Sequence, residues 1–164
     1  MKSQRMNSVF GLALLVTISL VGAVLLVPAG DALAGKASRK LEGTWLVQVT
    51  IQNCQTGDDL KTFPALLTFA QGGTLTETTT GFTPAARTPG HGFWRFADGA
   101  YSASSEAFLF GPDGTYIGRQ TIGQAIEFGS DPDAFSSTAS ITIVDPGGNT
   151  VMTGCATAVA SRMK

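Results

Sequence analysis

The sequence predicts an all-β protein, a single up-and-down antiparallel β-barrel of about eight strands preceded by an N-terminal signal peptide. After residue 40, alternating, β-branched or aromatic runs are separated by short turn signals rich in Gly, Pro and Asp. Strands joined by such tight turns are antiparallel neighbours, because a parallel crossover needs a dozen or more residues. Closing the meander into a barrel removes its exposed edges.

Residues 1–34 have the pattern of an export signal. Two basic residues precede an uncharged, Leu- and Val-rich run over residues 9–27, and Ala32-Leu33-Ala34 supplies a cleavage pattern of small residues. We therefore expect cleavage after Ala34, a periplasmic or secreted protein, and one barrel domain over residues 35–164. A retained anchor is the alternative, because the apolar run could just span a bilayer.

Composition narrows the choice of partners. Only 14% of the residues are charged, the net charge is −1, and no basic cluster is present. This pattern argues against a nucleic-acid partner. The absence of a long apolar run after residue 35 argues against a membrane-embedded mature form. We expect a small-molecule ligand and no cofactor, and a homo-oligomer stays open.

Cys54 and Cys155 are the two cysteines of the chain. In an oxidising compartment they are expected to form a disulfide, with free thiols or metal ligation as the alternatives. Two Cys and the single His lack the ligand count and spacing of a zinc site, so we expect no metal.

The first half of the barrel is predicted from alternation and from proline. Trp45, Val47, Val49 and Ile51 share one face of the first run, and Pro64 suits the start of the second. A Thr-rich third run is followed by a loop over residues 81–90. The expected strands here cover residues 44–53, 62–69, 74–80 and 92–97.

Turn chemistry predicts the second half and its register. Asp98-Gly99 is a two-residue turn, which places His91 opposite Glu106, and Pro112-Asp113-Gly114 is a three-residue loop, which places Glu106 opposite Gln120. The remaining strands are expected at residues 100–110, 115–128, 135–144 and 150–162. Both turns bring one set of side chains to a common face: His91, Phe93, Arg95, Ser102, Ser104, Glu106, Phe108, Phe110, Tyr116, Gly118, Gln120, Ile122, Gln124, Ile126 and Phe128.

We interpret this common face as the barrel interior, although a one-residue slip in either hairpin would reverse part of it. Aromatic and polar groups mixed in this way are typical of ligand pockets. The candidate ligand-binding residues are Arg95, Glu106, Phe108, Phe110, Tyr116, Gln120 and Gln124.

The segment Gly43-Thr44-Trp45 resembles the Gly-x-Trp at the start of the first strand of lipocalins and related calycin barrels. In that family a basic residue near the end of the last strand packs over the Trp at the closed base, and Arg162 matches it here. A register that faces Cys54 with Cys155 would place Val47 opposite Arg162. The chain more nearly resembles small exported bacterial lipocalin-like proteins of unassigned function.

The leading function is therefore the binding of a small, mostly apolar ligand with a polar end in the lumen. One alternative is an isomerase or cyclase in which His91 and Glu106 act as an acid–base pair; these two are the candidate catalytic residues, and no hydrolase motif accompanies them. The other alternative is an interaction module that pairs through an exposed face containing Trp94, Phe96, Tyr101 and Leu109.

Overall fold

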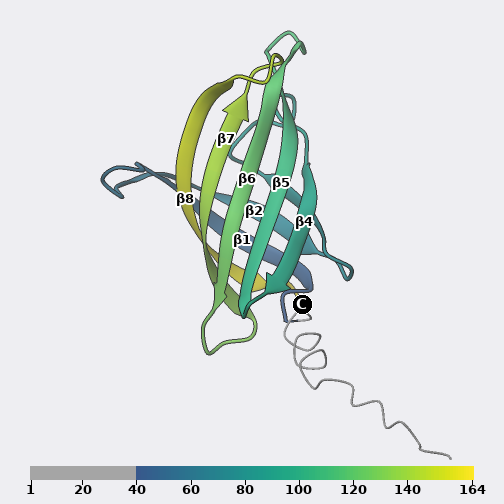
Figure 1. Cartoon of the computed structure of the whole chain (residues 1–164), viewed down its shortest axis with the longest axis vertical. Helices are drawn as coiled ribbons and strands as arrows, with labels where there is room; N and C mark the ends of the chain where they lie inside the picture. The colour runs from purple at the N-terminus through teal and green to yellow at the C-terminus, as the bar shows by residue number, and fades with distance from the viewer. Residues whose placement is uncertain (1–39) are drawn as a thin grey trace, which may run out of the picture.

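The computed structural model describes residues 40–164, which form eight strands closed into one antiparallel barrel (Figure 1). Each strand pairs with the next, and β8 pairs with β1, which confirms the predicted all-β barrel. The predicted signal peptide and the domain boundary at residue 35 lie outside the described residues. The strands are β1 (Gly43–Gln52), β2 (Asp59–Phe69), β3 (Thr74–Thr79), β4 (Gly90–Ala97), β5 (Ala100–Phe110), β6 (Tyr116–Phe128), β7 (Ala134–Val144) and β8 (Thr150–Arg162).

The predicted turns place β4, β5 and the start of β6. Asp98 and Gly99 have φ of 52° and 82°, the pair of positive values that a type I′ turn requires. The predicted register of β4 and β5 is confirmed, including His91 opposite Glu106, and so is the first pair after the next turn, Phe110 with Tyr116. Within the described part of the chain, no helix is long and apolar enough to cross a membrane.

A β-bulge directly after that turn was not predicted. Leu109 pairs with Gly118, so β6 carries Ile117 as an extra residue relative to β5. Gly118 has φ of +148°, and a Cβ on it would collide with the backbone oxygen of Val144 on β7. Only glycine tolerates this backbone conformation and this lack of space, so Gly118 permits the bulge at this position.

The bulge reverses the faces of β4 and β5 relative to the interpretation from sequence. Side chains alternate along a strand, so one extra residue moves the partner of Glu106 from Gln120 to Thr121. Trp94, 6% exposed, faces the interior, and Phe108, 54% exposed, faces solvent. The residues wrongly placed inside are His91, Phe93, Arg95, Ser102, Ser104, Glu106, Phe108, Phe110 and Tyr116, whereas Gln120, Ile122, Gln124, Ile126 and Phe128 of β6 do face inward.

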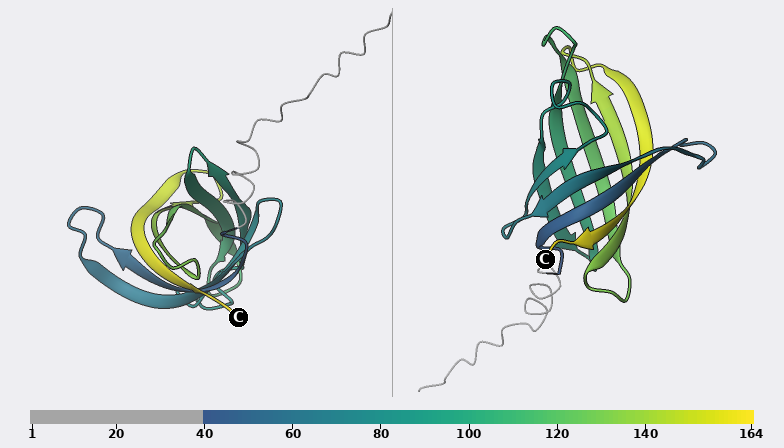
Figure 2. Two further views of the ribbon diagram at one scale, coloured as in Figure 1. Left: turned by 90° about the horizontal axis from the view of Figure 1, so that it is seen from below. Right: turned by 180° about the vertical axis from the view of Figure 1, so that it is seen from behind.

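An aromatic cluster fills the end of the barrel where β1 begins and β8 ends, the lower end in Figure 1. The Trp45 ring meets the edges of Phe128 and Phe135 at centroid distances of 5.8 and 4.8 Å. The Trp45 indole also donates a hydrogen bond of 3.0 Å to the carbonyl of Leu41. The left view of Figure 2, seen from below, shows the strands as a ring around the barrel axis. These aromatic rings, of which Trp45 and Phe135 are buried, close the lumen at this end.

Arg162 covers the closed end from outside. Its guanidinium lies 4.2 Å from the Trp45 ring centroid and donates to the carbonyls of Lys40 and Glu42 and to the Asp133 carboxylate. The register between β1 and β8 places Arg162 opposite Trp45. The prediction that Val47 would face Arg162 is wrong by two residues, because Cys54 lies beyond the end of β1 and is no ladder partner of Cys155.

Tyr101 lies inside the barrel, 7% exposed, and its phenol oxygen has no hydrogen-bond partner among the described residues. Burial raises the pKa of this phenol above its ordinary value of 10.0. The folded state therefore holds the proton more tightly than the unfolded state. The contribution of Tyr101 to stability is constant below pH 10 and is lost as the pH rises from 10 through the folded-state pKa.

We expect this titration to be visible in a Tyr116→Phe variant, in which Tyr101 is the only tyrosine left. Tyrosinate absorbance should appear at higher pH in the native protein than in the same protein in denaturant. Coincident native and denatured titrations would show that Tyr101 is not held in a desolvated site.

Candidate functional site

A cavity of about 560 Å³ occupies the end of the barrel opposite the aromatic cluster. Several inward-facing residues of β7 and β8 are small there: Ala139, Gly154, Ala156 and Ala158 line the cavity and leave room that larger side chains would fill. The cavity is open to solvent, with the exposed side chains of Leu60 and Phe82 at its mouth.

The wall of the cavity is mainly aliphatic and aromatic, with a few polar groups. Val49 and Ile51 of β1 and Ile122 of β6 contribute to the wall, and Ile141 and Ile143 of β7 add to the apolar surface. Such a lining, of a volume between about 300 and 1,000 Å³, is the usual form of a small-molecule site. The polar side chains of the deeper wall are Glu77, Thr79, Gln120, Gln124 and Ser137.

A buried ion pair adjoins this wall. Arg87 donates to both carboxylate oxygens of Glu77 on β3, to the amide oxygen of Gln120 at 2.6 Å and to the carbonyl of Thr88 at 3.1 Å. Arg87 and Glu77 are each only 5% exposed. Gly90 makes room for the pair, because a Cβ there would collide with the Glu77 carboxylate.

The loop of residues 81–89 runs alongside β5 just before β4 begins, and this pairing with β5 directs Arg87 inward. Arg87 forms a β-bridge with Leu109, and the Phe110 amide donates to the carbonyl of Ala86 at 2.9 Å. Since Leu109 faces the interior, so does Arg87. Arg87 was not among the site residues predicted from the sequence. The signal that could have revealed it is weak: one Arg in a loop otherwise free of charge.

The predicted ligand-binding residues divide between the two faces. Gln120 and Gln124 line the cavity. The remaining five lie on the outer surface, where Arg95 stacks over Phe93 and the aromatic rings contact each other. The bulge at Gly118 is the physical reason for this correction. The five residues on the outside are Arg95, Glu106, Phe108, Phe110 and Tyr116.

His91 and Glu106 also lie outside the lumen. They are opposite each other on β4 and β5, but Glu106 accepts from Thr121 at 3.3 Å and pairs with Arg119 at 3.4 Å on an exposed surface. The two groups share no cavity, so the reason for proposing them as an acid–base pair is lost. Among residues 40–164, no cluster of three or more His, Cys, Asp or Glu side chains is placed to hold a metal ion.

The face proposed for protein interaction is interior. Trp94, Tyr101 and Leu109 are buried, and Phe96 packs against the core. Trp94 donates to the carbonyl of Ala70 at 2.9 Å and contacts the edge of Phe69. An interaction through these side chains would require the barrel to open, so this prediction is wrong.

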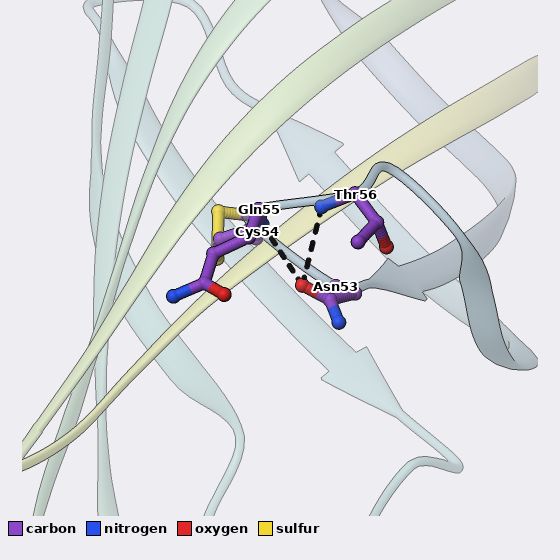
Figure 3. The surroundings of a disulfide bond; sticks show 5 residues. Asn53, Cys54, Gln55 and Thr56 are labelled. Atoms are coloured by element: carbon purple, nitrogen blue, oxygen red, sulfur yellow. Dashed lines mark hydrogen bonds between the residues drawn. A yellow bond between two sulfur atoms is a disulfide. The ribbon is translucent and has the colours of Figure 1, made fainter.

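The predicted disulfide is confirmed. Cys54 and Cys155 are bonded with their Cα atoms 5.3 Å apart, and the bond joins the turn after β1 to β8 beside the cavity mouth (Figure 3). Asn53 shapes this turn, since its side-chain oxygen accepts from the amides of Gln55 at 2.9 Å and Thr56 at 3.4 Å. A disulfide is typical of proteins outside the reducing cytoplasm.

No protein-family model matches the chain, and no curated protein matches it. The crystal structure of Rv2717c from M. tuberculosis is similar with a TM-score of 0.37 and 15% sequence identity, over 85% of this chain and 99% of that chain.

Proposed function

We propose that this protein is an exported binding barrel, which holds a small, mostly apolar ligand with a polar end in its lumen. The observation that carries the proposal is the open cavity of about 560 Å³, with an aliphatic wall and a few polar side chains. An eight-stranded barrel can be filled by its own side chains, and here small residues such as Ala139, Ala156 and Ala158 leave this cavity open. The polar end would meet Gln120 and Gln124, rather than Arg95 and Glu106.

Two further parts of the proposal concern family and location. Gly43, Trp45 and the overlying Arg162 support a lipocalin-like barrel, with the basic side chain packed over the Trp at the closed end. The disulfide and the export pattern of residues 1–34 support a periplasmic or secreted protein.

The test is binding of the uncharged fluorescent dye N-phenylnaphthylamine to the wild type and to an Ala156→Phe variant. Ala156 lines the cavity between Ile51 and Ala139, so a phenyl ring there would occupy the ligand space. We expect at least about tenfold weaker dye binding, with a thermal midpoint unchanged or raised because the ring fills a void.

Ala125→Phe is the matched control, since Ala125 is exposed on the outer face of β6. It should leave dye binding unchanged. Equal binding by all three proteins would place the dye outside the lumen, and absence of binding to the wild type would remove the support for a ligand barrel.

A further inference from the structure

Gln120 is a buried amide whose orientation is determined by its neighbour. Its side chain lines the cavity but is 5% exposed, and its oxygen accepts from Nε of Arg87 at 2.6 Å. A guanidinium group only donates hydrogen bonds, so the oxygen of the amide must face Arg87. The amide nitrogen, which carries two N–H donors, therefore lies on the side away from Arg87.

That nitrogen has no acceptor among the described residues. The Glu77 carboxylate is engaged by Arg87, and Gln120 faces Ile143 in register on β7, with Ile122 next along its own face of β6. The neighbouring wall is therefore apolar on two sides. The nitrogen is not among the fully buried atoms that lack a partner, so it keeps surface open to the cavity that Gln120 lines. An acceptor carried by a ligand could therefore accept a hydrogen bond from it.

Charge restricts what that acceptor can be. Glu77 neutralises Arg87, so the deep wall offers an anion no net positive charge. The basic residue that lines the cavity is Lys61, which is exposed and lies over the Phe63 ring with Nζ 5.6 Å from its centroid. A ligand carboxylate at Gln120 would lose its hydration and would lie near the negative charge of Glu77, and both effects are unfavourable. An uncharged carbonyl oxygen avoids both.

We propose that the cavity selects uncharged ligands with a carbonyl oxygen, such as an ester, ketone or amide on an apolar body, and that Gln120 donates to this oxygen. Arg87 is a positioning residue that holds the Gln120 amide in its donating orientation, and Glu77 fixes Arg87. This inference rests on the proposed function and adds to it the polarity and charge of the ligand.

The experiment measures the affinity of N-phenylnaphthylamine and its displacement by methyl laurate, laurate and dodecylammonium. The dye has no carbonyl group, so its affinity reports whether the cavity binds at all. We expect methyl laurate to displace the dye from the wild type at lower concentration than laurate or dodecylammonium. Absence of dye binding would overturn the proposed function itself, whereas tighter binding of laurate than of methyl laurate would overturn only the inference about charge.

Two substitutions at the same position test the donor. Gln120→Met removes the amide and should lower the affinity for methyl laurate about tenfold, which corresponds to the loss of one hydrogen bond. The affinity for the dye should not change. Gln120→Glu keeps an acceptor for Arg87 but supplies a carboxylate in place of the donor. It should weaken methyl laurate as much and shift the preference toward dodecylammonium.

Gln48→Met is the matched control, because Gln48 is exposed on the outer face of β1 and should alter none of these affinities. If the role of Gln120 were purely structural, both variants would lower the affinities for the dye and for all three ligands together. Unchanged methyl laurate affinity in Gln120→Met, with the dye still bound, would also overturn the assignment of Gln120 as the donor.

Discussion

Replacing Arg87 by Met is expected to lower the free energy of unfolding by about 3–5 kcal/mol. The substitution leaves the Glu77 carboxylate, 5% exposed, without its counter-charge, and removal of one partner from a buried pair carries a penalty of this size. It also leaves the oxygen of Gln120 without its donor. Denaturant unfolding followed by fluorescence of the buried Trp45 and Trp94 measures the change.

Two comparisons make this result specific. A double variant, Glu77→Leu with Arg87→Met, removes both charges and should recover most of the lost stability, because an apolar pair of similar volume can replace a buried ion pair. Arg95→Met on the outer face should change stability by less than about 0.5 kcal/mol. A loss in Arg87→Met no larger than that in Arg95→Met would show that the pair is solvated in solution.

Removal of the disulfide by a double Cys54→Ala and Cys155→Ala change should lower the free energy of unfolding by about 2–5 kcal/mol. The bond closes a loop with a sequence separation of 101 residues, for which the chain-entropy model allows up to about 4.7 kcal/mol. The ladder between β1 and β8 ends at the pair of Gln52 and Cys155, so the mouth of the cavity would loosen first. Dye binding should weaken as a consequence of this loosening.

The wild type under reducing conditions is the control for this prediction, and its unfolding midpoint should match that of the double variant. Thiol titration of the native protein should find no reactive thiol. Two titratable thiols in the native exported protein would contradict the bridge and the stabilisation assigned to it.

Local signals were sufficient to predict all eight strands and most turns, although β2 begins at Asp59, three residues before the predicted start, and contains Pro64 in its middle. Asp98-Gly99 and Pro112-Asp113-Gly114 have few low-energy backbone conformations, so each turn identifies the pair of residues that follows it. The disulfide was equally predictable, because a chain with two cysteines has one possible pairing. These features depend on residues close in sequence or on a count.

The division of residues between lumen and surface could not be read in the same way. The predicted pattern is correct for β6 beyond Ile117, and the pattern on β5 is the reverse of that predicted. The reason is that β6 carries Ile117 as an extra residue between the pairs Phe110–Tyr116 and Leu109–Gly118. A glycine inside a predicted strand, such as Gly118, is a signal of a bulge. The sequence alone does not say whether the bulge forms, because it depends on the close approach of Val144 on β7.

By itself, the sequence determined that this protein is a meander of eight antiparallel strands with a disulfide, because strand alternation and turn chemistry act over a few residues. The tertiary structure alone decided which face encloses the cavity and that Arg87 is buried. Arg87 reaches Gln120, which lies 33 residues away in sequence, only because the loop of residues 81–89 runs along β5. Contacts of this kind exist only once the barrel has closed.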